Sequence, residues 1–268
     1  MKYWFLAVLF FCFLGVIWGF LIEPNLLVVR SYNLNLPQFK GLRIVFASDW
    51  HIAPWQEPRL NKTINKINSL HPDIIILGGD FVKGHKFATS MTPEKIAQHL
   101  GNLKAKYGTF AVLGNHDWYL NGKQVRKELE RNNIKVLENE NVQVKTDKHS
   151  LYIAGVADIL TRKPDIRQTL QNIPLQKTIF ISHSPDIFPD IKEKLPLILS
   201  GHTHGGQVKA PFLGALIVPS KYGTRYAEGE FWEASKRMIV SKGLGTSLLP
   251  VRFNCPPEIV LLEFSADD

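Results

Sequence analysis

The sequence has little cysteine, and its two cysteines are placed where they exclude two common kinds of site. Cys12 lies in an apolar run and Cys255 lies near the C-terminus, so the pair makes no disulfide framework. No C-x-x-C pair is present, which excludes the zinc and redox motifs built on one. Low-complexity stretches and repeats with a period of about 20–50 residues are also absent, which excludes solenoid and propeller arrays.

Charge is missing from one long stretch near the N-terminus, YWFLAVLFFCFLGVIWGFLI, residues 3–22. A helix of about 20 residues spans the roughly 30 Å core of a bilayer. Trp4 and Trp18 lie toward the two ends of the stretch, where indoles prefer the membrane interface. The exit from the stretch is bulky and offers no small-residue site for signal-peptide cleavage. We therefore expect an uncleaved single-pass transmembrane helix over residues 1–22, with the side that the rest of the chain faces left open.

From residue 41 onward, short apolar runs rich in β-branched residues recur along the chain. Each run has the length of one strand and is apolar throughout, as in strands covered on both faces. Helix-like segments such as EPRLNKTINKINSL and KQVRKELERNN separate several of them. Strands that alternate with helices predict an α/β architecture. The runs are LRIVFAS, DIIILGG, TFAVLG, LYIAGVA, TIFIS and PLILSG.

Two flanking regions complete the expected organisation. Residues 23–40 alternate polar and apolar side chains, which predicts a linker with a first strand. Toward the C-terminus, GQVKAPF, EASKRMIVSKG and PEIVLLEF follow one another with little helix between them. These segments predict an antiparallel or mixed second sheet packed on the first. The expected units are therefore an anchor over 1–22, a linker and first strand over 23–40, and one domain over 41–268.

Metal-ligating side chains follow five of the predicted strands, at the point where each strand ends. In open α/β sheets the carboxyl ends of the strands meet at the ligand crevice. A single polar residue at a strand end is ordinary turn chemistry. Five strand ends that together supply histidine, aspartate and asparagine predict a common site instead. The residues are Asp49, His51, Asp80, Asn115, His116, Asp117, His183, His202 and His204.

The mixture of ligand types limits the metal chemistry. Carboxylate, amide oxygen and imidazole without thiolate suit Mn²⁺, Fe or Zn²⁺. Seven candidate ligands are too many for one ion that keeps open positions. We therefore expect two divalent ions about 3.5–4 Å apart that share a carboxylate, with manganese preferred and iron or zinc as alternatives. Such a pair neutralises phosphate charge and activates a water, which predicts phosphoryl chemistry.

The motif order D-x-H, GGD, GNHD, H and GHTH resembles the calcineurin-like metallophosphoesterase superfamily, and the resemblance covers Leu42–Phe264. The tail from GHTHGGQV to PPEIVLLEF is similar to the membrane-associated bacterial branch. That branch includes exported phosphodiesterases and a UDP-2,3-diacylglucosamine pyrophosphatase of lipid A biosynthesis. The resemblance implies a four-layer αββα sandwich of two mixed sheets and a place at the bacterial cytoplasmic membrane.

Carried over position by position, the resemblance also implies a role for each candidate residue. His116 contacts the phosphate and protonates the leaving group, and Asp117 orients His116. The implied metal ligands are Asp49, His51 and His204 for one ion, Asn115, His183 and His202 for the other, and Asp80 as the bridge between them.

We therefore expect a membrane-anchored dinuclear phosphohydrolase that cleaves a phosphodiester or pyrophosphate bond. A lipid-linked compound such as UDP-2,3-diacylglucosamine is the candidate substrate. A non-catalytic metal-binding scaffold of the same fold is one alternative, although such proteins typically lose ligands and none is missing here. A nuclease is the other alternative, suggested by the formal net charge of +8. No nucleic-acid motif accompanies that charge, so no nucleic-acid partner is expected.

For two further groups of side chains, the sequence allows either a contact with the substrate or a role in packing. Arg252 offers a phosphate clamp if it lies near the site. Aromatic residues beside the ligand motifs form either a wall for an acyl chain or base, or ordinary core, and packing is the preferred interpretation. They are Trp50, Trp55, Phe81, Phe87, Trp118 and Tyr119.

Overall fold

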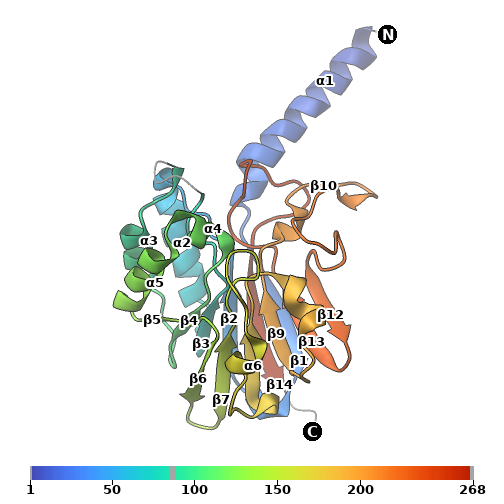
Figure 1. Ribbon diagram of the computed structural model, residues 1–268. Helices are drawn as coiled ribbons and strands as arrows, with labels where there is room; N and C mark the ends of the chain where they lie inside the picture. Colours follow the sequence, from blue (N-terminus) through green and yellow to red (C-terminus); the bar gives the residue numbers. More distant parts are fainter. Residues whose placement is uncertain (1, 85–88, 266–268) are drawn as a thin grey trace.

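The computed structural model describes residues 2–84 and 89–265 (Figure 1). These residues form two six-stranded mixed sheets and a two-stranded hairpin. The first sheet has the strand order β1-β14-β2-β3-β4-β5, and the second has the order β12-β13-β9-β8-β7-β6. The strands are β1 (Val28–Asn35), β2 (Arg43–Ala47), β3 (Ile74–Leu77), β4 (Thr109–Ala111), β5 (Ile134–Val136), β6 (Glu140–Lys145), β7 (Ser150–Gly155), β8 (Thr178–Ile181), β9 (Leu197–Ser200), β10 (Lys209–Ala210), β11 (Gly214–Ala215), β12 (Gly229–Glu233), β13 (Lys236–Val240) and β14 (Glu258–Ser265).

Helices cover the outer face of the first sheet, where α2, α3 and α5 lie side by side (Figure 1). The outer face of the second sheet carries short segments: α6 and the 3-10 turns Leu175–Lys177 and Pro185–Asp190. The expected mixed α/β fold with two sheets is confirmed, and the layer over the second sheet is thin. The helices are α1 (Lys2–Ile17), α2 (Glu57–Asn68), α3 (Pro93–Leu100), α4 (Asn115–Leu120), α5 (Gly122–Arg131) and α6 (Ile166–Thr169).

The apolar runs are strands that are buried on both faces, as their composition predicts. In β2, Ile44 and Phe46 point into the core between the two sheets. Val45 and Ala47 point into the core under the helices. The alternation follows from the two-residue period of a strand. Each central strand therefore ends at a fixed place between two cores, and the residues that follow it are held there.

The predicted place of the C-terminal strand is wrong. β13 joins the second sheet as expected, but β14 lies in the first sheet between β1 and β2, parallel to β1 and antiparallel to β2. The reason is that β14 is apolar on both faces: Val260 and Leu262 face the inter-sheet core, while Ile259 faces the helix side. Such a strand needs a neighbour on each side and a layer over each face. The pairing also makes residues 23–40 part of the sandwich, because β1 lies in that segment.

The apolar stretch at residues 3–22 is not one helix. α1 ends at Ile17, and Trp18–Ile22 forms a wider π-helical turn. The carbonyl of Gly19 in that turn accepts a hydrogen bond from the backbone N–H of Arg252 at 2.9 Å, so the turn is shaped by its contact with the domain. Across residues 2–84 and 89–265, we find no helix with both the length and the apolarity needed to cross a membrane. The structure therefore has a 16-residue helix and this turn where the sequence predicts one transmembrane helix.

Candidate metal centre

The carboxyl ends of β2, β3, β4, β8 and β9 meet at one edge of the sandwich, the upper edge in Figure 1. The loops that leave these strands carry the predicted ligands. Five of those ligands have a positive backbone φ, between 43° and 70°. This conformation is unfavourable for residues other than glycine, and such strain gathers at functional sites. The five are Asp49, His51, Asp80, His202 and His204.

One group of ligand atoms gathers around His51 and His204. The Nε2 atoms of these two rings lie 3.0 Å apart. Asp49 Oδ1 lies 3.6 Å from His204 Nε2, and Asp80 Oδ2 lies 3.4 Å from His51 Nε2. All four side chains are buried. Two imidazoles and two carboxylates thus face one point.

A second group gathers around His183. Its Nε2 atom lies 3.2 Å from Asn115 Oδ1 and 3.2 Å from His202 Nδ1. Asp80 Oδ2 is 3.4 Å from the same nitrogen. Asp80 Oδ2 is therefore equally distant from His51 in the first group and His183 in the second. The two groups share this carboxylate oxygen, as the bridging role predicts.

The distances between these side chains are better explained by bound metal ions than by hydrogen bonds between the side chains. Two imidazole nitrogens bound at right angles to one ion, each about 2.1 Å from it, lie about 3 Å apart, which is the His51–His204 separation. Within the described residues, Nδ1 of each of these buried rings has no hydrogen-bond partner. His183 donates from Nδ1 to the carbonyl of Gly78 at 2.8 Å, which leaves its Nε2 lone pair for a ligand. Hard oxygens with imidazoles form a donor set for two divalent ions.

Glycines allow the two sheets to approach this closely. A Cβ on Gly114 would lie 2.2 Å from Asp80 Oδ1 and 2.6 Å from Cε1 of His183. A Cβ on Gly201 would lie 2.4 Å from Asp49 Oδ2. Because these contacts are far below van der Waals distance, the motifs GNHD and GHTH need glycine immediately before the ligands.

Burial controls the protonation of three of the imidazoles. It lowers the pKa of His51 to about 3 and the pKa of His202 to about 4. Burial also holds the pKa of His204 well below its ordinary value. These three rings are neutral at pH 7, which is the form that binds metal. Burial would lower the pKa of His183, but the Asp80 charge, the hydrogen bond to Asp80 and the Asp49 charge together raise it well above its ordinary value, so a metal ion must replace a proton on this ring.

The carboxylates respond in opposite directions. Burial would raise the pKa of Asp80, but the neighbouring His183 imidazole leaves that pKa well below its usual range. Burial raises the pKa of Asp49 to about 6, although Ser48 Oγ donates to its Oδ2 at 2.5 Å and the His202 N–H donates to its Oδ1 at 2.9 Å. Asp80 is thus ionised across the neutral range, as a bridging ligand must be.

His116 lies at the edge of the centre and is half-buried. Its ring stands edge-on to His51, with the ring centroids 4.6 Å apart. Its Nδ1 is 3.1 Å from the carbonyl of Lys83 and donates to it, and its backbone N–H donates to Asp80 Oδ1 at 2.8 Å. The bond to Lys83 places a proton on Nδ1 of this ring. Sequence reasoning missed this contact because a backbone carbonyl leaves no signal in the residue pattern.

Asp117 is fully buried and accepts four backbone N–H bonds. Its Oδ2 accepts from Asp80 and Gly114, each at 2.9 Å. Its Oδ1 accepts from Phe81 at 2.8 Å and from Val82 at 3.2 Å. The carboxylate therefore ties the loop after β3 to the start of α4. Burial, with the Asp80 charge, raises the pKa of Asp117 to about 7, although the four donors favour the ionised form.

The remaining candidates divide between packing and surface. Arg252 is completely buried and donates to backbone carbonyls, including those of Lys242 at 2.8 Å and Cys255 at 2.9 Å, so it braces a loop and does not clamp phosphate. Trp50 and Phe81 belong to the core under the helices. Trp118 packs partly buried against the same core, whereas Trp55 and Tyr119 are exposed. Phe87 lies outside the described residues.

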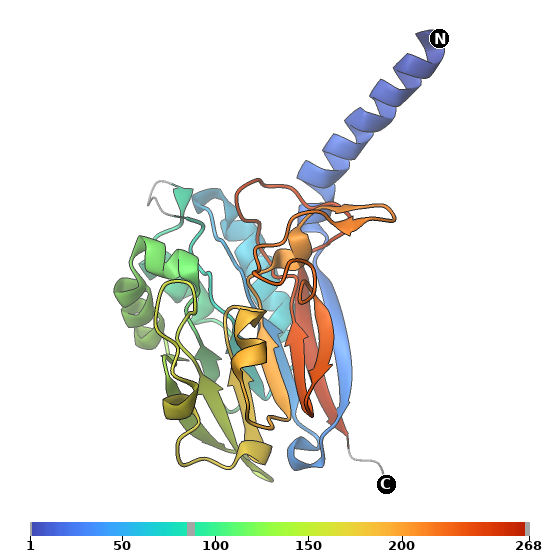
Figure 2. The ribbon, with the colours of Figure 1, turned by 45° about the vertical axis from the view of Figure 1, so that its right-hand side comes forward.

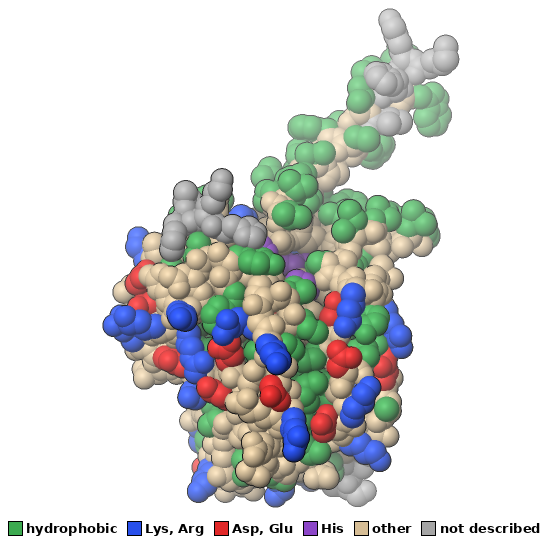
Figure 3. Space-filling view, in the orientation of Figure 1, with side chains coloured by type: hydrophobic (Ala, Val, Ile, Leu, Met, Phe, Trp, Pro, Cys, Tyr) green, Lys and Arg blue, Asp and Glu red, His purple; other side chains and the backbone are tan. Residues whose placement is uncertain are grey.

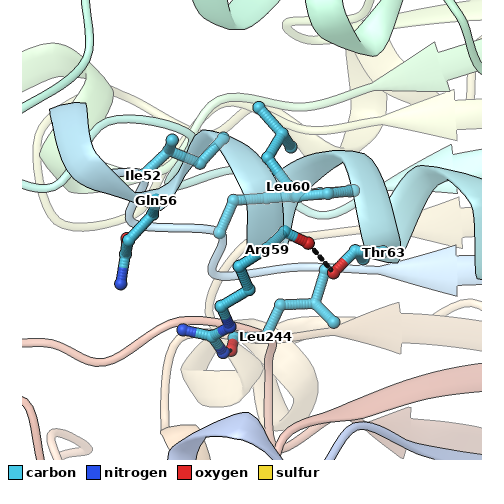
Figure 4. Close-up of a pocket in the computed structure, with 7 residues that line it drawn as sticks. Ile52, Gln56, Arg59, Leu60, Thr63 and Leu244 are labelled. Atoms are coloured by element: carbon cyan, nitrogen blue, oxygen red, sulfur yellow. Dashed lines mark hydrogen bonds between the residues drawn. The ribbon is translucent and has the colours of Figure 1, made fainter.

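A small cavity beside Trp50 is a packing gap (Figure 4). Its volume is about 20 Å³, which is room for about one water. Arg59 reaches across it from α2 and donates to the carbonyl of Leu244, while Thr63 donates to the carbonyl of Arg59 at 3.0 Å (Figure 4). This cavity is too small for a substrate.

Comparisons with known proteins identify the family of this chain. The family model for calcineurin-like phosphoesterases matches residues 42–206. An uncharacterized metallophosphoesterase, YkuE of Bacillus subtilis, is 31% identical over 249 residues, which cover 90% of this chain and 86% of that protein. The UDP-2,3-diacylglucosamine pyrophosphatase LpxG of Chlamydia trachomatis is 29% identical over 305 residues and 92% of each chain.

Among solved structures, the NAD nucleotidase NadN of Haemophilus influenzae superposes with a TM-score of 0.51 at 16% identity. The match covers 76% of this chain and 45% of that one, and it supports the fold alone. The family match covers more than half of the chain, and its residues include the ligand motifs from Asp49 to His204. The chain therefore belongs to the calcineurin-like phosphoesterase family and is a metal-dependent phosphoesterase.

Proposed function

We propose that the chain is a dinuclear metal-dependent phosphohydrolase that cleaves a phosphodiester or diphosphate bond in a lipid-linked substrate. The observation that carries the proposal is the position of Asp80 Oδ2, which is 3.4 Å from both His51 Nε2 and His183 Nε2. This oxygen joins two sets of ligands into one centre. Manganese is the proposed metal, with iron or zinc as the alternatives.

Each ligand has a defined place in the proposed centre. When bound, two divalent ions supply charge neutralisation at the phosphate and a water activated for attack. The residues proposed to hold them are Asp49, His51 and His204 on one side, Asn115, His183 and His202 on the other, and Asp80 between them.

His116 is the proposed general acid. The Lys83 carbonyl holds its Nδ1–H, so a proton on Nε2 is the one that can pass to the leaving oxygen. The ring is half-buried at the edge of the centre. Asp117 acts at a distance from this step, because its carboxylate fixes the loop that carries Asp80.

The substrate class rests on two supports. LpxG is named for a diphosphate bond in a diacylated sugar nucleotide, and it matches this chain over 92% of its length. In this chain, exposed apolar side chains surround the same edge of the molecule as the metal ligands (Figure 3). We therefore propose UDP-2,3-diacylglucosamine or a similar acylated phosphate compound as the substrate.

We also propose that residues 3–22 hold the protein at the bacterial cytoplasmic membrane. Tyr3 and Trp4 are at least 80% exposed in the structure, and apolar side chains such as Phe11 and Leu21 are exposed along the segment. Burying them in lipid removes this apolar surface from water. The test is fractionation of cells that express the full chain, followed by an alkaline carbonate wash. Protein that stays with the membrane supports attachment, and full release into the supernatant contradicts it.

The decisive assay compares three substrates with purified, Mn²⁺-loaded protein. UDP-2,3-diacylglucosamine, a nucleotide diester and a phosphomonoester separate the candidate activities. Release of UMP from the first, with little product from the third, supports the proposal. Preference for the phosphomonoester contradicts it, and the absence of any hydrolysis favours a non-catalytic scaffold. Strong salt-dependent DNA binding with cleavage would instead indicate a nuclease.

A further inference from the structure

An apolar groove opens directly beside the metal ligands. It has a volume of about 350 Å³ and lies between the segment that follows His204 and the loop at residues 247–251. Thr203 and His204 line its inner end. Figure 2 shows the β10–β11 hairpin projecting beside this region, next to the N-terminal helix. Its lining is Thr203, His204, Gly206, Gln207, Val208, Leu216, Ile217, Pro219, Ser247, Leu248, Leu249 and Val251.

The groove offers almost nothing to a polar ligand. None of its lining residues is Asp, Glu, Lys or Arg, and His204 belongs to the metal centre. The side-chain amide of Gln207 is used at both ends: its oxygen accepts from the Ser247 N–H at 2.5 Å, and its nitrogen donates to the Val251 carbonyl at 3.3 Å. Thr203 Oγ1 donates to the Ala227 carbonyl at 2.6 Å. A base or sugar would find few partners here besides the Ser247 hydroxyl, so the groove suits an apolar occupant.

The outer end of the groove is unusually apolar and exposed. Leu216 and Leu249 are 65% and 62% exposed, and Leu248 is 95% exposed. Phe212 at the tip of the hairpin is fully exposed. Figure 3 shows apolar side chains at the base of the N-terminal helix and on both sides of the histidines. Exposed apolar patches of this kind mark binding sites.

The segment at residues 3–22 lies beside the groove: a Cβ on Gly19 would lie 3.2 Å from Cγ2 of Val251, which lines the groove. Trp18 from that segment and Pro211 from the hairpin line one surface hollow of about 390 Å³. Glu23 at the end of the segment accepts hydrogen bonds from the Asn254 N–H at 2.9 Å and from Trp18 Nε1 at 2.5 Å. The groove mouth and the apolar segment are thereby held at the same edge of the protein.

We propose that this groove binds an acyl chain of the substrate while the phosphate lies at the metal ligands. The inference rests on the proposed function, because His204 is shared between the groove and the centre. A chain attached close to the scissile phosphate would run from His204 outward between Leu216 and Leu249. Its far end would leave the protein at the rim, where it can remain in a lipid layer.

The test measures the binding of ethyl phosphate and octyl phosphate to the full-length, Mn²⁺-loaded chain, kept in solution by an amphipathic polymer. Each buried methylene strengthens binding by about fourfold, so octyl phosphate should bind at least about tenfold more tightly than ethyl phosphate. A double variant, Leu216→Gln with Leu249→Gln, should reduce this ratio toward one. Both side chains are more than half exposed, so the fold does not depend on them.

The matched control is Trp232→Gln, which removes a 59% exposed apolar side chain from β12. Trp232 pairs with Arg237 at the start of β13, away from the metal ligands, so the ratio should stay at the wild-type value. Equal affinities of the wild type for the two phosphates would overturn the proposal that the groove binds an acyl chain. A ratio that the double variant leaves unchanged would do the same. Failure of ethyl phosphate to bind, with tight octyl phosphate binding, would support the groove but count against the metal centre.

Discussion

Asp117 provides the sharpest test of how the centre is built. Each of its carboxylate oxygens accepts two backbone N–H bonds, from Asp80 and Gly114 at one oxygen and from Phe81 and Val82 at the other. In Asp117→Asn, one oxygen becomes an NH₂ group, whichever way the amide turns. Two buried N–H groups then lose their acceptor and face another donor.

The magnitude follows from these bonds. A buried N–H left without a partner costs about 1–3 kcal/mol, so the variant should lose about 2–6 kcal/mol of unfolding free energy. For a chain of this size that loss lowers Tm by about 5–20 °C. Because three of the four donors are Asp80 and the two residues that follow it, the variant should also bind less Mn²⁺. Thermal unfolding with and without Mn²⁺, together with elemental analysis, measures both effects.

A control variant separates this role from a general effect of charge removal. Asp165→Asn changes a carboxylate that accepts one bond, from the Gln168 N–H at 2.8 Å at the start of α6. Asparagine caps helices as well as aspartate does, so the change should stay within about 0.5 kcal/mol. If Asp117→Asn kept wild-type stability and metal content but lost turnover, the structural role of Asp117 in tying the loop after β3 to α4 would be refuted. Asp117 would then act through His116, as the sequence predicts.

Three other predictions concern the same centre. His116→Gln should lower kcat by about 10²–10⁴-fold while the metal content stays at the wild-type level, and unchanged turnover would remove His116 from the mechanism. Gly114→Ala should abolish metal binding, because its Cβ would lie 2.2 Å from Asp80 Oδ1, whereas Gly15→Ala, with no atom near its Cβ, should not. In the metal-free protein, burial raises the pKa of Asp49 from 3.8 to about 6, so the folded state binds this proton more tightly than the unfolded state does. The contribution of Asp49 to the free energy of unfolding therefore falls as the pH rises from about 4 to about 6. Because Mn²⁺ replaces the proton, it should raise Tm more at pH 7 than at pH 5, and an equal rise at both would contradict this reasoning.

The strands and the ligand set could be predicted because both depend on local sequence. β2 and β3 are apolar on both faces, so their burial and their ends follow from composition alone. Asp49 and Asp80 follow those ends within three residues, and parallel neighbours bring strand ends together. In the structure, all seven predicted ligands lie in the two groups that share Asp80.

Other features depend on contacts that leave no local signal. β14 reads as a C-terminal strand of a second sheet, but its partner β1 is more than 200 residues earlier, and only tertiary packing selects it. The bond from His116 to the Lys83 carbonyl involves a backbone atom, which any residue would supply. Arg252 has the composition of a phosphate clamp, yet its guanidinium is consumed by backbone carbonyls. In each case the residue type indicated a kind of structure or contact, but the neighbouring sequence did not indicate the partner.

The most direct test of the two-ion centre is a titration of phosphodiesterase activity against equivalents of Mn²⁺ per metal-free chain. Because Asp80 joins two sets of ligands, activity should rise until about two equivalents are bound and then level off. Asn115→Ala, which removes a ligand from one set only, should reduce the bound metal to about one equivalent with little activity. Full activity at one equivalent, or two bound equivalents with no hydrolysis of any diester, would contradict the proposed dinuclear phosphohydrolase.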